Sequence, residues 1–217
     1  MTAPWLNVIG IGLGAWEDIP VRGKTLIQNA EVLFGSERQL ALVPPDAFTG
    51  ERVVWQGLND TAASILSYRG KQVAALASGD PMFYGLASTM IRGRVTADEM
   101  FVMPHPSSYS LACARLGWPM QDAQFLTAHG RPLDNVLIHL RPSIKWLVLC
   151  ADGTTPGLLA ARLVDNGYGA SRLIALSNLE GDEKRWEATA ETWTTARTDA
   201  SRAARSTFAV PWTLVAI

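Results

Sequence analysis

Short apolar segments alternate with helix-like segments through the first half of the chain, and this alternation constrains the fold more than any other feature. The apolar segments are rich in valine, leucine and alanine, which is typical of strands buried on both faces of a sheet. Strand–helix alternation predicts a parallel sheet with helices on both faces. The strand candidates are 5–11, 32–34, 52–55, 72–77 and 100–103, and the helix candidates are 20–29, 37–42, 59–68, 81–92 and 107–116.

The second half of the chain has a different pattern. The stretch "GWPMQD", Gly117 to Asp122, breaks the alternation with glycine and proline, and we take it as the domain boundary. We therefore expect an N-terminal α/β domain over 1–118 and a C-terminal α/β domain over 119–217. In the second domain a strand at 145–151 leads into a helix that starts near Thr155 and Pro156. Three strand candidates follow with short connections, at 171–176, 185–192 and 207–216, and predict a mixed sheet with antiparallel edges.

Composition excludes several classes of protein. The chain has 217 residues, of which 48% are hydrophobic and 18% charged, and this favours an ordered globular protein. A formal net charge of -1 gives no indication of nucleic acid or an anionic membrane as a partner. An acidic ligand would have to be bound by local arginines. The N-terminus lacks the pattern of a signal peptide, and no apolar stretch reaches the length of a membrane helix.

The cysteines and histidines point to a cytoplasmic protein without a metal site. The two cysteines, Cys113 and Cys150, have no paired spacing, so we expect reduced thiols in the core. The three histidines do not have the spacing of zinc ligands, so we expect no catalytic metal.

A glycine-rich loop follows the first strand candidate in "LNVIGIGLGAW". Gly10, Gly12 and Gly14, with Ala15, satisfy the permissive dinucleotide pattern G-x-G-x-x-A. A dinucleotide fold needs the first helix to begin at this turn, whereas Pro20 is the best first position for a helix here. The loop therefore favours close approach of backbone to another ligand, and a tight strand exit with no ligand is the alternative.

Two further loops leave the fourth and fifth strand candidates. In "ALASGDPMFYG" the chain turns at Ser78 and Gly79, and Asp80 is placed to cap the next helix. In "VMPHPSSYS", Ser107 or Ser108 can cap the helix that follows. Capping alone would account for both loops. Ligands of α/β sheets, however, bind at the carboxyl ends of parallel strands, and three such loops in one sheet favour a shared ligand.

Together these loops resemble a known family. A glycine loop, G-D-P-x-x-Y-G and P-x-x-S-S are similar to the tetrapyrrole (class III) S-adenosylmethionine-dependent methyltransferases. "VRG", "GSERQL", "LTAHGR" and the closing "PWTLVAI" resemble the branch that methylates C5 of (cobalt-)precorrin-7. That activity occurs alone or as the N-terminal half of precorrin-6Y C5,15-methyltransferases (decarboxylating).

The resemblance implies two α/β domains with the active site in the cleft between them, a homodimer, and a role in corrin biosynthesis. It also implies S-adenosyl-L-methionine as cofactor and S-adenosyl-L-homocysteine as product. Leu13, His105 and Ser177 depart from the family, which has proline, glycine and glutamate respectively at these positions, and Gly35 stands where some relatives have a catalytic aspartate. Carried over by motif, the cofactor contacts are Leu13, Ser78, Gly79, Asp80, Phe83, Ser107, Ser108, Ala151 and Leu179.

Candidate substrate and catalytic residues are fewer. His129 in "AHGR" is the candidate for moving a proton, since imidazole titrates near neutral pH, and a structural hydrogen bond is its alternative role. Arg131 is suited to pair with the acetate and propionate groups of a precorrin, and Arg22 and Arg38 are further candidates. Gly12 is expected to lie at the rim of the substrate.

Three other functions compete with C5 methylation. They are methylation of another corrin carbon, a nicotinamide-dependent oxidoreductase, and a module that binds a corrinoid without turnover. We also expect that the chain is fused to, or works with, a decarboxylating C15-methyltransferase, because it stops soon after the last expected strand.

Overall fold

The computed structural model describes residues 4–92, 94–193 and 213–216, and it divides the chain into two compact units at Ser107–Ser108. The expected boundary at 118–119 lies eleven residues later. The two boundaries differ because the helix α5 (Ser108–Leu116) belongs to the second unit, where it contacts β7 (Lys145–Leu149) and β10 (Thr213–Ala216).

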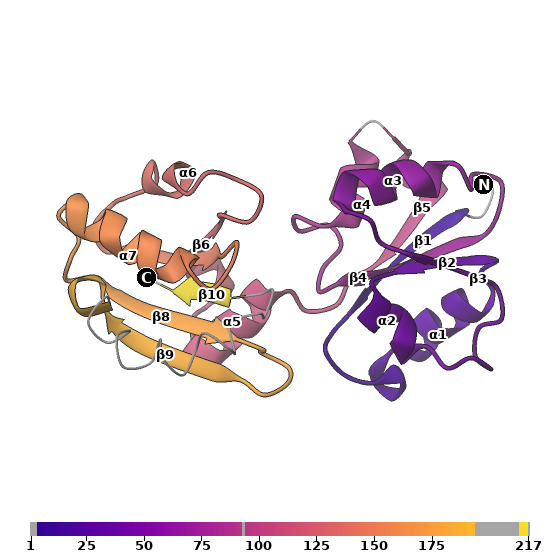
Figure 1. Ribbon diagram of the computed structural model, residues 1–217, viewed down its shortest axis with the longest axis horizontal. Helices are drawn as coiled ribbons and strands as arrows, with labels where there is room; N and C mark the ends of the chain where they lie inside the picture. Colours follow the sequence, from indigo (N-terminus) through magenta and orange to yellow (C-terminus); the bar gives the residue numbers. More distant parts are fainter. Residues whose placement is uncertain (1–3, 93, 194–212, 217) are drawn as a thin grey trace. The chain divides into compact units, whose positions relative to one another are not determined.

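The first unit is a five-stranded sheet in the order β3-β2-β4-β1-β5, with every pairing parallel. Helices cover both faces, with α1 and α2 on one side and α3 and α4 on the other (Figure 1). The strands are β1 (Leu6–Ile11), β2 (Val32–Gly35), β3 (Glu51–Val54), β4 (Val73–Ser78) and β5 (Met100–Met103). The helices are α1 (Val21–Gln28), α2 (Glu37–Leu42), α3 (Leu58–Leu66) and α4 (Leu86–Ile91), with 3-10 turns at Trp16–Asp18 and Ala97–Glu99.

Alternating side chains of the central strands fill two core layers. In β1, Leu6 and Val8 belong to the layer beneath α3 and α4, whereas Ile9 and Ile11 belong to the layer with α1 and α2. This follows from the two-residue period of a strand, which sends successive side chains to opposite faces. All six residues of β1 are buried, Asn7 among them, and the other five are apolar or glycine.

The second unit is a five-stranded mixed sheet in the order β6-β7-β10-β8-β9. β6 and β7 are parallel, while β10 pairs antiparallel with both β7 and β8, and β9 pairs antiparallel with β8. α7 packs its buried side on one face through Leu159 and Leu163. Besides α5, β7 and β10, the second unit contains a 3-10 turn at Met120–Asp122, β6 (Ala123–Thr127), α6 (Asp134–Leu137), α7 (Thr155–Asp165), β8 (Arg172–Ser177) and β9 (Lys184–Thr189).

The expected fold class is confirmed, with a parallel sheet in the first unit and a mixed sheet in the second. One edge strand of the mixed sheet, β9, is antiparallel to its neighbour as expected, whereas the other edge strand, β6, is parallel to β7. β6 was not among the expected strands. Of the expected strand 207–216, residues 213–216 form β10 and the rest lies outside the described residues.

The expected helix over 81–92 is wrong in its first half. α4 begins only at Leu86, with Gly85 as its N-cap, and Asp80 does not cap a helix. Residues 81–85 form turns instead, and Tyr84 has a positive φ of 56°. A side chain at Gly85 would lie 2.7 Å from the carbonyl oxygen of Pro81, so the chain is tightly folded there. The late start of the first helix is confirmed, because α1 begins at Val21.

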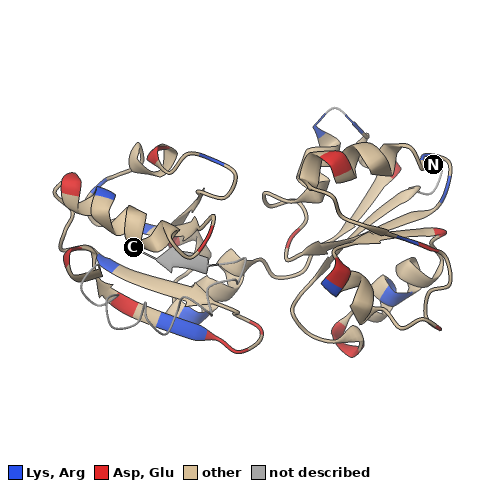
Figure 2. Ribbon diagram, in the orientation of Figure 1, with Lys and Arg blue, Asp and Glu red and all other residues tan. Residues whose placement is uncertain are grey.

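Acidic and basic residues are mixed along the described elements of both units (Figure 2). Several pair across neighbouring elements, such as Arg69 with Glu99 in the first unit and Arg172 with Glu187 in the second. Among the residues that the structure describes, no helix combines the length and apolar character needed to cross a membrane.

Candidate functional site

Three loops follow neighbouring strands at one edge of the first sheet. β4, β1 and β5 are adjacent and parallel, so their carboxyl ends lie together. Ile11 at the end of β1 pairs with Ser78 at the end of β4. The strand order thus brings together the glycine loop, the G-D-P loop and the P-x-x-S-S loop, which we call the three-loop edge.

Gly10 allows these loops to approach one another. A Cβ atom at this position would lie 2.2 Å from the carbonyl oxygen of Gly79 and 2.6 Å from the backbone nitrogen of His105. The two neighbours also contact each other, since the His105 N–H donates to the Gly79 carbonyl at 3.3 Å. The Gly79 N–H in turn donates to the Ile11 carbonyl at 3.0 Å. Backbone from three strand exits is therefore packed around a position that has no room for a side chain.

Gly79 satisfies a second requirement of the same edge. Its φ is +64°, a conformation that favours glycine, and a Cβ there would lie 3.2 Å from the Cα of Ser107. Ser78 and Gly79 on one loop and Ser107 on the next are therefore neighbours, as the sequence predicts for a common ligand.

A buried glutamine joins the three-loop edge to α2. Ser36 and Gln39 form a capping box, in which the Gln39 N–H donates to Ser36 Oγ at 3.3 Å and the Ser36 N–H donates to Gln39 Oε1 at 2.8 Å. The Gln39 side chain also donates from Nε2 to Ser78 Oγ at 3.2 Å. Sequence reasoning missed Gln39, although the S-x-x-Q spacing of "SERQ" is a capping signal that identifies it as part of a helix start.

The two candidate substrate-binding arginines of the first unit make different contacts. Arg38 donates to the carbonyl oxygen of Gly12 at 3.4 Å, which places its guanidinium beside the glycine loop. The guanidinium of Arg22 stacks over the ring of Phe101 on β5, 4.2 Å from its centroid. Arg38 is therefore directly associated with the three-loop edge, whereas the observed contact of Arg22 is on a strand.

The first two loops expose apolar side chains. Leu13 is 40% exposed, Met82 46% and Tyr84 41%, and the ring of Phe83 lies 4.9 Å from that of Tyr84. The carboxylate of Asp80 accepts a hydrogen bond from the Met82 N–H at 2.9 Å, so it orders its own loop. Exposed apolar groups beside backbone polar groups suit a ligand that is partly flat and partly polar.

Residues predicted in the second unit follow strands that run in one direction. β7 and β8 are both antiparallel to β10, and β6 is parallel to β7, so the carboxyl ends of β6, β7 and β8 meet at one edge. His129 and Arg131 follow β6 in a turn with Gly130 at φ +66°. The turn is fixed by the His129 N–H, which donates to Thr127 Oγ1 at 3.1 Å, and by the Ala128 N–H, which donates to the Leu149 carbonyl at 2.8 Å.

Leu179 and Ala151 follow the other two strands of that edge. Leu179 is buried, and its carbonyl accepts a hydrogen bond from Arg115 at 3.1 Å, while Arg115 also pairs with Glu183. Ala151 is exposed at the end of β7 and precedes Asp152. Asp152 Oδ1 accepts hydrogen bonds from the backbone N–H of Thr154 at 2.8 Å and from its hydroxyl at 2.6 Å, and from Thr155 as well.

Replacing Asp152 by alanine is expected to lower the free energy of unfolding at neutral pH by about 1 kcal/mol, the usual net contribution of a side-chain hydrogen bond. Hydrogen bonds from Thr154, then Thr155, lower the pKa of Asp152 in the folded protein. A lowered folded-state pKa gives stability that is present above the ordinary pKa and is lost as pH falls through the folded value. The difference between the two proteins should therefore narrow below about pH 4. Thermal unfolding over a pH series measures this, and a constant difference would contradict it.

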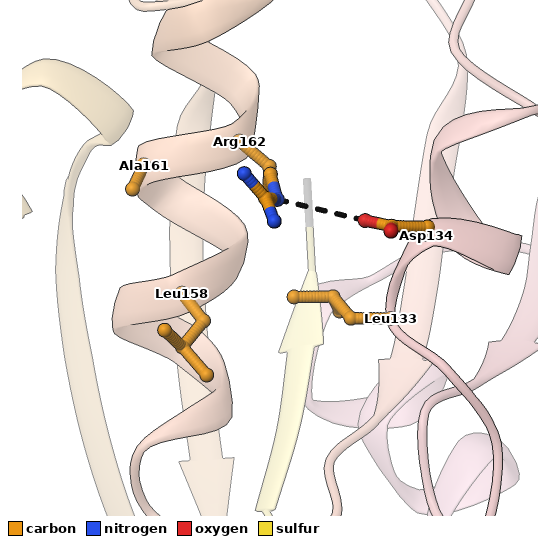
Figure 3. Close-up of a pocket in the computed structure, with 5 residues that line it drawn as sticks. All are labelled: Leu133, Asp134, Leu158, Ala161 and Arg162. Carbon is orange, nitrogen blue, oxygen red and sulfur yellow. Dashed lines mark ion pairs between the residues drawn. The ribbon is translucent and has the colours of Figure 1, made fainter.

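A separate hollow of about 310 Å³ lies between α6 and α7 of the second unit (Figure 3). Arg162 and Asp134 face one another across it, with 3.5 Å between Nε and Oδ1. None of the predicted site residues lines it, so we do not associate it with the loops at the strand ends. Its lining residues are Leu133, Asp134, Leu158, Ala161 and Arg162.

The described residues contain no group of three or more histidine, cysteine, aspartate or glutamate side chains that could hold a metal ion. Cys113 and Cys150 are buried and form no disulfide, as expected from their spacing, and burial raises the pKa of the Cys113 thiol.

Comparison with known proteins assigns the family. The family model for tetrapyrrole (corrin/porphyrin) methylases matches residues 6–166. The chain belongs to this family. A solved tetrapyrrole methylase, the uroporphyrin-III C-methyltransferase of Thermus thermophilus complexed with S-adenosylhomocysteine, has the same fold, with a TM-score of 0.67 and 18% identity. That match covers 97% of this chain and 96% of the other.

Two relatives in the tetrapyrrole methylase family differ in length. The chain is 43% identical to precorrin-6Y C(5,15)-methyltransferase (decarboxylating) of Sinorhizobium sp. over 186 residues, which is 85% of this chain and 45% of that protein. It is 28% identical to cobalt-precorrin-7 C(5)-methyltransferase of Salmonella typhimurium over 186 residues, 83% of this chain and 88% of that protein. The chain thus spans about half the length of the bifunctional relative.

Proposed function

We propose that this tetrapyrrole methylase transfers a methyl group from S-adenosyl-L-methionine to C5 of a precorrin-7-type intermediate in cobalamin biosynthesis. The proposal rests on how much of each relative the chain covers. It covers 88% of a relative named for methylation at C5 alone, but only 45% of a relative named for methylation at C5 and C15. Because C5 is common to both names, it is the position that the shared segment supports.

The three-loop edge fits the cofactor that this function needs. Glycines let backbone N–H and C=O groups approach a ligand closely, and Ser78 adds a hydroxyl at the end of β4. When bound, the cofactor would supply an electrophilic methyl group on its sulfonium. The protein's task is then alignment of donor methyl and acceptor carbon, which can contribute about 7–11 kcal/mol. We assign cofactor binding to Leu13, Ser78, Gly79, Asp80, Phe83, Ser107, Ser108, Ala151 and Leu179.

Recognition of the substrate is assigned to arginines and apolar side chains. Arg38 beside Gly12 has a cationic, bidentate group suited to the acetate and propionate groups of a precorrin, as do Arg131 and Arg22. The exposed Met82 and Tyr84 offer apolar contact to the macrocycle face. We propose that His129 relays the proton that C5 loses after methylation; the ring nitrogens make C5 nucleophilic without a strong base.

We also propose that the chain acts in the cytoplasm as a homodimer, with a decarboxylating C15-methyltransferase fused to it or acting beside it. Its two buried cysteines form no disulfide, which suits a reducing compartment, and the longer relative has room for a second enzyme. Static light scattering measures the oligomeric state directly.

Incubation of the protein with methyl-labelled S-adenosylmethionine and precorrin-7, with and without cobalt in the ring, is expected to place the label on C5. NMR of the product identifies the methylated carbon. Label on another carbon would change the position but keep the enzyme class. Binding of S-adenosylhomocysteine with no transfer to any precorrin would favour a binding module. If the protein binds NAD(P)H but does not bind S-adenosylhomocysteine, the result would favour an oxidoreductase.

A further inference from the structure

The side chain of Gln39 is a buried polar group at the three-loop edge. It is only 4% exposed, although glutamine is usually a surface residue, and it links α2 to the end of β4. A buried amide is stable only when its donors and acceptor are hydrogen-bonded, so its contacts indicate what it does.

The hydrogen bonds fix which way the amide points. The backbone N–H of Ser36 can only donate, and it contacts Gln39 Oε1 at 2.8 Å. The NH₂ group must therefore face Ser78 Oγ, 3.2 Å away. Since an amide NH₂ can only donate, Ser78 Oγ is the acceptor in this contact. The proton of the Ser78 hydroxyl is then directed to another acceptor.

We propose that Gln39 is a positioning residue that holds the Ser78 hydroxyl as a hydrogen-bond donor to an oxygen atom of the cofactor. Ser78 is exposed at the end of β4, next to Gly79, where the three loops meet. The carboxylate and ribose oxygens of S-adenosylhomocysteine are acceptors of the required kind. This inference rests on the proposed function, because it assumes that the three-loop edge binds this cofactor.

Gln39→Glu tests the direction of the hydrogen bond. A carboxylate has nearly the same shape, still accepts from the Ser36 N–H, and accepts from Ser78 as well. The Ser78 hydroxyl then donates its hydrogen bond to this carboxylate and can no longer donate to the ligand. Isothermal titration with S-adenosylhomocysteine should show affinity reduced about 3- to 10-fold, the usual worth of one net hydrogen bond. Ser78→Ala should lose a similar factor, and the double variant should be no weaker than either single variant.

Two further variants separate orientation from charge and from helix stability. Gln39→Met carries no charge and leaves the hydroxyl unoriented, so it should also lose affinity, although less than Gln39→Glu. It remains informative if Gln39→Glu does not fold. Ser36→Ala weakens the cap of α2 but keeps the Gln39–Ser78 contact, so its affinity should equal that of wild type. Thermal unfolding of each variant reports whether the fold is kept.

Each outcome separates the two proposals. Failure of the wild-type protein to bind S-adenosylhomocysteine overturns the proposed function. If wild type binds and Gln39→Met binds equally well, Gln39 does not orient Ser78 and the inference is wrong while the function stands. The inference is also wrong if the losses of affinity from Gln39→Glu and Ser78→Ala add up in the double variant. It is wrong as well if Ser36→Ala binds S-adenosylhomocysteine as weakly as those two variants do.

Discussion

Replacing Gly10 by alanine is expected to lower the free energy of unfolding by about 3 kcal/mol or more, because the new methyl group has no space. Its Cβ would lie 2.2 Å from the Gly79 oxygen and 2.6 Å from the His105 nitrogen. Both atoms are backbone and are hydrogen-bonded to each other, so neither can move away as a flexible side chain would. Affinity for S-adenosylhomocysteine should fall with stability, since the same displacement separates the loops. Urea denaturation and calorimetry measure the two effects.

Gly169→Ala is the matched control for this variant. The atoms nearest to a Cβ there would be those of the flexible Glu191 side chain, at an ordinary 3.4 Å, so stability should change by less than about 1 kcal/mol. Equal unfolding free energies for the Gly10 variant and wild type would mean that the three-loop edge yields easily and does not hold a fixed shape.

Elements with strong local signals could be predicted from the sequence. α2 has the predicted bounds, Glu37–Leu42, because its capping box and its apolar pattern agree. The buried strands β1 and β4 follow from their largely apolar sequences. The late start of the first helix could be predicted from Pro20, because proline is favoured at the beginning of a helix, and α1 begins at the next residue.

Elements that depend on tertiary contacts could not be predicted. Asp80 and Pro81 have the composition of a helix start, but the close packing of Gly85 on Pro81 holds that segment in turns. β6 has mixed composition, and its strand pairing depends on β7, which lies about twenty residues further on. Assignment of α5 to the second unit likewise depends on contacts with distant strands.

In the candidate site, too, the residues with a local sequence motif could be predicted, whereas those that depend on tertiary contacts could not. Ser78, Gly79 and Ser107 were predicted from motifs, and their proximity follows once β4, β1 and β5 are neighbours. Gln39 could not be tied to Ser78, because that contact depends on the pairing of β2 with β4, two strands separated in the sequence by β3.

Replacing Arg52 by methionine is expected to lower the free energy of unfolding by about 2–4 kcal/mol. The guanidinium donates to four backbone carbonyls, one in the last turn of α2 and three in the connection from α2 to β3, and the ring of Phe48 lies 5.5 Å from it. Three of the four acceptors belong to buried residues and would be left without this donor. The acceptors and their distances are Leu40 at 2.7 Å, Val43 at 3.0 Å, Pro44 at 3.1 Å and Phe48 at 3.2 Å.

The comparison variant is Arg172→Met, which removes an arginine of the second unit from an exposed pair with Glu187. The Arg172 side chain is 64% exposed, and exposed ion pairs contribute little to stability, so this variant should unfold almost as wild type does. If both methionine variants unfold at the same urea concentration, Arg52 does not hold the α2–β3 connection together. If only Arg52→Met is weakened, its affinity for S-adenosylhomocysteine should also fall, because α2 carries Gln39 and hence the contact to Ser78.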